Sequence, residues 1–164
     1  MSLIINAPND IYSVENHGNL KVFLAGSSTN WQSEFIQIFG SVDNVSLYNS
    51  RKTSTVTDLG EMEKYLVWEY EHSISADLNI YWVSKNIDMI SLFDLGMSLD
   101  KKPIIIGIDP SFQYIQEMTL KLRLSGYGLD IFTSIKAMAS EASSFIERAF
   151  ANASREDDED EEED

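Results

Sequence analysis

The sequence predicts a doubly wound α/β domain with a parallel sheet of about five strands, and three observations support this prediction. Short apolar segments alternate about five times with segments in which apolar residues recur at helical spacing. The 164 residues have the length of a single domain, and 43% of them are apolar, which is enough for a substantial core. The chain has no cysteine, so neither disulfides nor zinc-thiolate sites hold it together.

The strand candidates are short runs of apolar, branched or aromatic residues. Residues 21–26 form such a run and end at Gly26, which is typical of a strand buried on both faces. Residues 78–83 combine branched and aromatic side chains, and residues 104–108 contain four isoleucines around one glycine. The remaining strand candidates are residues 42–48 and 129–133.

Each strand candidate precedes a helix candidate whose apolar residues recur every three or four positions. Asn30 is the expected N-cap of the first helix, and Asp58 with Glu61 three residues later is typical of the start of the second. The Lys-Lys-Pro segment at residues 101–103 indicates that the third helix ends there, because proline cannot continue a helix. The expected helices begin near residue 30 and then cover residues 61–75, 91–100, 112–122 and 134–150.

The two ends of the chain differ from this alternating body, which covers residues 20–151. Residues 1–19 contain two apolar segments, 3–5 and 11–14, and are expected to form an extra hairpin or an arm on a neighbouring subunit. Residues 152–164 end in nine consecutive carboxylates that repel one another, so we expect a disordered acidic tail. Such a tail most simply adds solubility, and contact with a basic protein partner is the alternative.

The charge balance excludes several classes of function. The chain has 27 acidic and 12 basic residues, and without the nine terminal acids the remainder is only mildly acidic. Direct nucleic-acid binding is not expected, because it requires clustered lysine and arginine. No segment resembles a membrane span or a signal peptide, and two histidines cannot build a histidine-rich metal site. We expect a soluble, cytoplasmic protein with no metal and no other cofactor.

In a doubly wound sheet, ligands bind outside the carboxyl ends of the strands. The sequence places four segments at this edge: residues 26–30, 49–58, 84–94 and 109–112. The backbone amides of the turn at Gly26, Ser27 and Ser28 could hold a phosphate or a sugar hydroxyl at the start of a helix. A tight turn without a ligand is the alternative and is favoured on pattern alone.

Three carboxylates are the main candidates for chemistry at this edge. Glu69 lies on the second expected helix, Asp88 in the loop after the third strand, and Asp94 in the first turn of the next helix. Two or three acids around one pocket can divide the roles of nucleophile and general acid or base. A helix N-terminus would keep Asp94 ionised. The alternative is a capping box, in which Ser91 is the N-cap and Asp94 bonds back to its amide.

Several other side chains have simpler interpretations. Tyr65 and Trp68 are expected in the core, since aromatic residues at helical spacing usually pack. His72 is expected to be a solvated side chain beside Glu71. Arg51 and its neighbour Lys52 could attract an anion, although such pairs are commonly surface residues.

An ordered set of motifs resembles one protein family. The motifs are residues 22–27 (Val-Phe-Leu-Ala-Gly-Ser), Trp31-Gln32, residues 49–52 (Asn-Ser-Arg-Lys), Trp68-Glu69, Ala76-Asp77 and residues 90–96 (Ile-Ser-Leu-Phe-Asp-Leu-Gly). Over most of the domain, from about residue 20 to about residue 130, they occur in the order of the nucleoside 2-deoxyribosyltransferase-like proteins.

The resemblance implies a flavodoxin-like sheet and cleavage or exchange of the N-glycosidic bond of a 2′-deoxynucleoside or its monophosphate. It maps the nucleophilic carboxylate onto Asp94. It maps a second catalytic acid, which would hold the sugar hydroxyls or protonate the leaving base, onto Asp88. It also implies a homo-oligomer and a nucleoside or nucleotide ligand. The substrate-binding positions that it implies are Gly26, Ser27, Ser28, Arg51, Glu69 and Gly96.

Two departures from the family pattern leave alternatives open. Asp94 stands where the family has glutamate and is one methylene shorter, and displacement on that scale can lower a rate about a hundredfold. The usual Asn-Pro-Arg-Arg pattern reads Asn-Ser-Arg-Lys at residues 49–52, and lysine cannot replace a forked guanidinium. The chain is therefore a glycosyl transferase or hydrolase, a weakly active or inactive nucleotide-binding module, or an interaction protein that uses its acidic tail.

Overall fold

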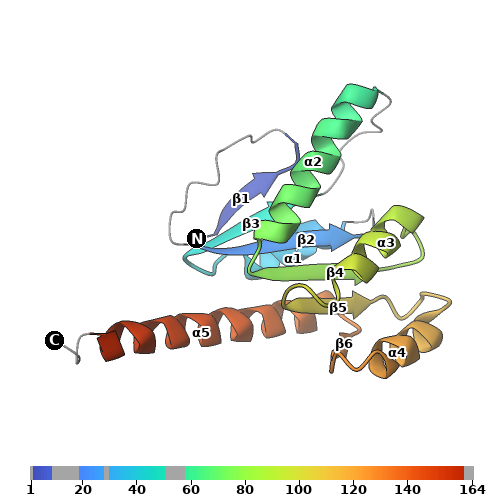
Figure 1. Cartoon of the computed structure of the whole chain (residues 1–164). Coiled ribbons are helices and arrows are strands. Elements are labelled where there is room, and N and C mark those ends of the chain that lie inside the picture. Colours follow the sequence, from blue (N-terminus) through green and yellow to red (C-terminus); the bar gives the residue numbers. More distant parts are fainter. Residues whose placement is uncertain (1, 9–18, 28–29, 51–57, 161–164) are drawn as a thin grey trace.

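A computed structural model of the chain shows a six-stranded, all-parallel sheet with helices on both faces (Figure 1). It describes residues 2–8, 19–27, 30–50 and 58–160, the last seven by their backbone alone. The strands are β1 (Leu3–Asn6), β2 (Leu20–Gly26), β3 (Val45–Asn49), β4 (Leu78–Val83), β5 (Ile104–Ile108) and β6 (Ile131–Phe132). The helices are α1 (Trp31–Phe39), α2 (Leu59–Ser75), α3 (Met89–Ser98), α4 (Ile115–Leu124) and α5 (Ile135–Asp160).

The strand order confirms the predicted fold class. The sheet runs β1-β3-β2-β4-β5-β6, and without β1 this is the 2-1-3-4-5 order of flavodoxin-like proteins. From β2 the chain moves outward to β3 and then crosses back to β4 on the other side of β2. The order therefore reverses between β2 and β4, and the carboxyl ends of these two strands are where such folds bind ligands.

The place of the first strand in the main sheet was not predicted. Residues 3–6 belong to the sheet itself, because β1 pairs in parallel with β3 from Leu3 opposite Ser46 to Asn6 opposite Asn49. The predicted partner segment in a hairpin, residues 11–14, lies outside the described residues. Its place in the sheet could not be predicted because β1 lies at the sheet edge, where Leu3 is 48% exposed and no regular burial pattern develops.

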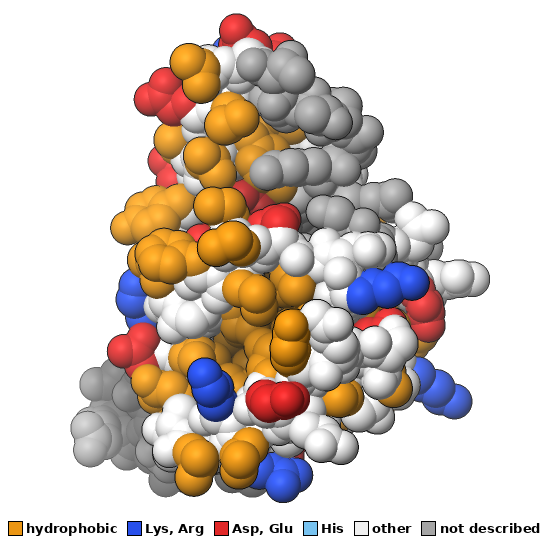
Figure 2. Space-filling view, turned by 90° about the vertical axis from the view of Figure 1, so that its right-hand side faces the viewer, with side chains coloured by type: hydrophobic (Ala, Val, Ile, Leu, Met, Phe, Trp, Pro, Cys, Tyr) orange, Lys and Arg blue, Asp and Glu red, His pale blue; other side chains and the backbone are white. Residues whose placement is uncertain are grey.

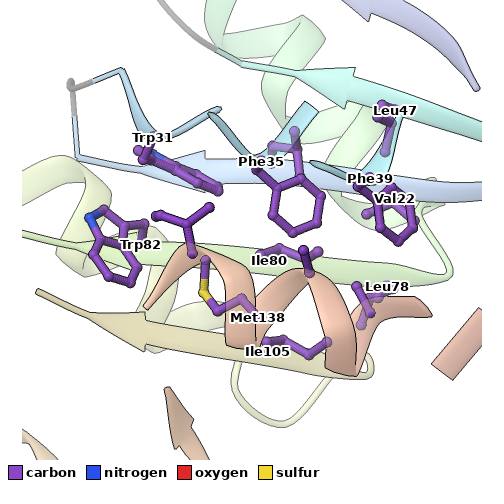
Figure 3. Packing of buried hydrophobic residues seen from close by; sticks show 14 of the residues in the cluster. Val22, Trp31, Phe35, Phe39, Leu47, Leu78, Ile80, Trp82, Ile105 and Met138 are labelled. Atoms are coloured by element: carbon purple, nitrogen blue, oxygen red, sulfur yellow. The ribbon is translucent and has the colours of Figure 1, made fainter. Parts of the chain in front are cut away.

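The core has two layers because alternate strand residues point to opposite faces of the sheet. On one face, α1 and α5 cover Val22, Leu24, Leu47 and Ile80 with large apolar side chains. Phe35 and Phe39 of α1 stack there with ring centroids 5.2 Å apart (Figure 3). On the other face, α2, α3 and α4 cover a layer that contains tyrosine and histidine as well as apolar residues.

The last helix is longer than the sequence predicted. Its first half packs on the sheet, with Met138, Ala142 and Ile146 buried. It continues to Asp160, ten residues beyond the expected end, and its C-terminal half extends past the body (Figure 1). Residues 161–164 of the acidic tail lie outside the described part. Within that part, no helix combines the length and apolarity needed to cross a bilayer.

Candidate active site between α2 and α3

A groove of about 460 Å³ lies between α2 and α3 over the sheet. Its floor consists of Phe23 and Ala25 of β2 and of Asn79 and Tyr81 of β4. Figure 2 views the molecule onto the carboxyl ends of the strands, where hydrophobic side chains surround a hollow. The groove thus begins at the strand pair where the order reverses, as expected for this fold.

The structure brings all three candidate acids into this groove. Glu69 of α2, Asp88 at the start of α3 and Asp94 within α3 line the same cavity, although 25 positions separate the first from the last. Gly26 lines it as well. The predicted convergence of the acids at one sheet edge is therefore observed, while their catalytic roles remain predictions.

Asp88, and not Ser91, caps α3. Its Oδ1 accepts a hydrogen bond from the backbone N–H of Ser91 at 2.8 Å, and its Oδ2 accepts one from the Ser91 hydroxyl at 3.2 Å. The predicted cap was wrong because the segment contains two overlapping signals, and aspartate is as good an N-cap as serine. The earlier start makes Asp94 the sixth residue of α3, outside the first turn, so the expected effect of the helix dipole on Asp94 does not apply.

A short chain of hydrogen bonds holds the turn of α3 that carries Asp94. The Ser98 hydroxyl donates to the carbonyl of Asp94 at 2.8 Å. Since that bond uses the only proton of the Ser98 hydroxyl, the hydroxyl of Tyr81 donates to Ser98 Oγ, at 3.1 Å. Burial raises the pKa of Tyr81 to about 12, helped by the charges of Asp94 and Glu69, so its hydroxyl stays a donor near neutral pH. The floor of the groove thus fixes the helix beside Asp94.

Glu69 is held by a buried tyrosine on its own helix. The Tyr65 hydroxyl donates to Glu69 Oε1 at 2.7 Å, across one helical turn, and also contacts the carbonyl of Ser50. Burial, followed by the charge of Glu69, raises the pKa of Tyr65 far above its ordinary value. Tyr65 is buried, as the sequence predicted, but it also orients an acid of the groove, which the sequence did not indicate.

The turn after β2 joins the two strands at the reversal point. Gly26 has a φ of +115°, and a Cβ there would collide with the carbonyl of Trp82, so this position requires glycine. The Ser27 N–H donates to that carbonyl at 2.8 Å, and the Ser27 hydroxyl accepts from the N–H of Ser84 at 2.7 Å. Ser27 is fully buried and is not among the groove residues, so its hydroxyl serves the scaffold.

Of the remaining predicted binding residues, Gly96 lies in the described part of the chain and does not line the groove. Gly96 lies on the exposed side of α3, with nothing within 4 Å of the position that a Cβ would take. Ser28, Arg51 and Lys52 lie outside the described residues. The described part of the motif that begins at Asn49 is held by Ser50, whose buried hydroxyl donates to the carbonyl of Leu24 at 2.8 Å.

Comparison with known proteins decides the family. The model of the family described as "Nucleoside 2-deoxyribosyltransferase like" matches residues 19–112, more than half of the chain. The chain belongs to this family. The match begins just before β2 and ends after β5, so it includes every residue that lines the groove.

Solved structures support the fold of this family member. The chain is similar to a conserved protein from Enterococcus faecalis V583, with a TM-score of 0.54 and 15% sequence identity over 77% of this chain and 98% of that protein. At this identity the similarity concerns the fold alone. No curated protein matches the sequence significantly.

Four groove residues within the family segment were not singled out as binding residues from the sequence. Gln32 and Asn79 are each 2% exposed, and their side-chain oxygens have no hydrogen-bond partner among the described residues. Lys101 and Lys102 line the groove beyond the end of α3. The one available signal was Asn79, a polar residue inside an otherwise apolar strand, because buried polar residues need an explanation. Within the described ranges, no three histidine, aspartate or glutamate side chains gather as a metal-binding group.

His72 corrects another expectation. It is 5% exposed and stacks on Trp68, with ring centroids 4.0 Å apart. Its Nδ1 donates to the Trp68 carbonyl at 2.7 Å, which fixes the tautomer of the neutral ring. Burial lowers the pKa of His72, outweighing the hydrogen bond to Trp68. The prediction of a solvated side chain was wrong because His72 continues the buried stripe of α2 that begins at Tyr65.

Proposed function

We propose that the protein cleaves or transfers the N-glycosidic bond of a 2′-deoxynucleoside or deoxynucleotide. The observation that carries this proposal is the meeting of three carboxylates in one groove, within the segment that matches the family. The groove volume lies inside the range of about 300–1,000 Å³ that is usual for small-molecule sites. Membership of the family supplies the substrate class.

Asp94 is the proposed nucleophile. Its carboxylate oxygen attacks C1′ of the sugar, the C1′–N bond breaks, and the base leaves with the bonding electron pair and takes up a proton. The resulting glycosyl ester is then attacked at C1′ by a second base or by water, which passes a proton to a neighbouring carboxylate. The bond between C1′ and the ester oxygen breaks, and the Asp94 carboxylate is restored. The Tyr81–Ser98 chain supports this role because it fixes the backbone at Asp94.

Asp88 and Glu69 are the proposed partners of Asp94. Both Asp88 oxygens accept from Ser91, but a carboxylate has about four acceptor sites, so Asp88 can also accept from sugar hydroxyls or, when protonated, donate to the leaving base. Glu69, oriented by Tyr65, binds the sugar or the base from the opposite wall. The expected homo-oligomer and the basic partner of the acidic tail stay predictions.

The experiment that tests this function measures release and exchange of the base. Purified protein is incubated with deoxynucleosides and deoxynucleotides, with and without a second free base, and the products are separated by chromatography. We expect turnover of at least one substrate and a loss of at least about a hundredfold in Asp94→Ala. Asp130→Asn, which removes an exposed acid away from the groove, is the control. Unchanged turnover in Asp94→Ala would remove the proposed nucleophile.

A non-catalytic nucleotide-binding module is the second candidate function. It is favoured by one observation, the aspartate at position 94 in place of the longer glutamate of the family pattern. This function predicts saturable binding of a nucleoside or nucleotide without any product in the same assay.

A further inference from the structure

The groove differs in chemistry between its two ends. Helix α3 starts at the carboxyl ends of the strands, so Asp88 lies at that end of the groove and Asp94, the sixth residue of α3, lies further in. Asn79 is the second residue of β4 and lies opposite Phe23 of β2, toward the amino ends of the strands. Ile74 also lines this amino end, because the last turn of α2 leads directly into β4. Carboxylates thus line one end of the groove, and apolar side chains line the other together with Asn79.

Asn79 is a buried polar side chain at the apolar end. It is 2% exposed, and its Oδ1 accepts no hydrogen bond from the described residues. Its backbone is bonded, since its N–H donates to the carbonyl of Pro103 at 3.0 Å, so the strand is fixed while the side-chain oxygen stays unpaired. Lys101 and Lys102 line the groove as well, but both are exposed. Leaving a buried acceptor unpaired is destabilising, so a ligand explains this amide better than the fold does.

The unpaired atom decides which ligand group fits. Oδ1 is a carbonyl oxygen, so its partner must be an N–H or O–H donor. The amide of Asn79 can turn about its Cβ–Cγ bond, which lets Oδ1 meet a donor in the groove. Sugar hydroxyls find carboxylate acceptors at the acidic end, whereas a flat aromatic base suits the end lined by Phe23 and Ile74. The edges of bases carry N–H donors, and asparagine is a residue that reads such edges.

The spacing along β4 leaves room for a base between Asn79 and the proposed nucleophile. Tyr81 follows Asn79 by two residues on the same face of the sheet, roughly 7 Å along the strand. The Tyr81 hydroxyl bonds to Ser98, which in turn bonds to the carbonyl of Asp94. A base attached to a sugar at Asp94 therefore extends toward Asn79.

We propose that Asn79 determines base specificity, with its Oδ1 accepting a hydrogen bond from an N–H group of the base. The N–H belongs either to an exocyclic amino group, as in adenine, or to the ring, as in hypoxanthine, and the chemistry of recognition is the same. The proposal rests on the proposed function for the nucleoside nature of the ligand. It concerns binding, so it does not depend on cleavage.

Calorimetric titration of the full chain tests this assignment, with Asp94→Asn present throughout so that the ligands stay intact. Two ligand pairs differ by one N–H: 2′-deoxyadenosine with purine 2′-deoxyriboside, and 2′-deoxyinosine with 1-methyl-2′-deoxyinosine. We expect the N–H member of at least one pair to bind at least about tenfold more tightly than its partner. Selectivity within the first pair identifies an amino group as the donor, and selectivity within the second identifies the ring N–H.

Variants at position 79 separate a hydrogen bond from shape. Asn79→Leu has a similar size and no polar atom, so it should weaken the N–H member alone and bring the ratio close to one. Asn79→Asp keeps an acceptor at the same place and should retain the ratio. The matched control, Asn86→Leu, changes an exposed asparagine outside the groove and should leave all affinities unchanged.

Three results overturn the proposal. They are equal affinities within both pairs, a ratio that survives Asn79→Leu, and absence of binding by all four ligands. An equal weakening of every ligand by Asn79→Leu also counts against it, because Asn79 would then bond to the sugar or only shape the groove. The ligand pairs test the proposal without any change at Asn79, so a poorly folded variant does not protect it. Base release is measured separately: selective binding without release removes only the proposed function, and release with equal affinities removes only the role of Asn79.

Discussion

The two faces of the sheet are built from the same strands but differ in chemistry. On the face under α1 and α5, Val22, Leu24 and Ile80 of the strands pack against phenylalanine and methionine side chains of the helices. On the face under α2 and α3, the alternate positions of the same strands include Asn79 and Tyr81. One face is a closed apolar core, and the other keeps a groove lined by polar groups. The closed core and the proposed ligand site thus lie on opposite sides of one sheet.

The largest effect is expected from a cavity on the closed face. Phe35 is completely buried, so Phe35→Ala should lower the free energy of unfolding by about 3–5 kcal/mol. Urea denaturation measures the change. Ile38→Ala on the same helix is the control, because Ile38 is 43% exposed and should cost far less. Equal losses in both variants would contradict the assignment of stability to this face.

The next effect concerns the length of the side chain at position 94 on the groove face. If Asp94 is withdrawn by one methylene, Asp94→Glu should raise the rate of base release, by up to about a hundredfold, with little change in the unfolding free energy. Initial rates at saturating substrate measure this gain. A loss of rate would show that the groove is already shaped around the shorter side chain.

A smaller effect is expected at the floor of the groove. Tyr81→Phe removes the donor to Ser98 and should cost about 1 kcal/mol of stability together with a several-fold loss of base release. Tyr127→Phe, at an exposed tyrosine, should change neither quantity. Destabilisation with an unchanged rate would mean that Tyr81 braces β4 against α3 and does not position Asp94.

The smallest effect is a pH dependence on the groove face. Burial holds the pKa of His72 below the ordinary value of about 6.5, so the folded state resists a proton that the unfolded state accepts. Stability should therefore be complete above about pH 6.5 and fall as the pH drops toward the folded pKa. Unfolding free energies from pH 7.5 to 5 measure the slope. His72→Phe keeps an aromatic ring and should flatten it, and parallel slopes would exclude His72 as the cause.

The apolar framework could be predicted because its signals are local. β4 and β5 match the predicted ranges 78–83 and 104–108, since strands buried on both faces appear as continuous apolar runs. Asp58 caps α2 as expected, with its carboxylate accepting from the Glu61 N–H at 3.0 Å. The placement of the three acids along one groove was also predictable, because the topology sends their segments to one edge.

The remaining features depend on contacts between distant segments. Strand β1 is recognisable only through its pairing with β3, some forty residues away. The burial of His72 depends on the contact of its ring with Tyr48 of β3, besides its stacking on Trp68 one turn earlier in α2. Asn79 of β4 lies opposite Ile104 of β5, 25 positions later, and only the pairing of the two strands brings these segments side by side. Such pairings carry no pattern along the chain.

The length of α5 carries the acidic residues at its C-terminal end away from the groove (Figure 1). Phe150 is the last of the described side chains of this helix that packs on the core, and Asp160 follows ten residues later, roughly 15 Å along the helix axis. A fluorophore attached at position 160 would stand clear of the groove, because this end of α5 extends past the body (Figure 1). Protein immobilised through the same position would leave the groove open to solution, which suits surface-based binding measurements.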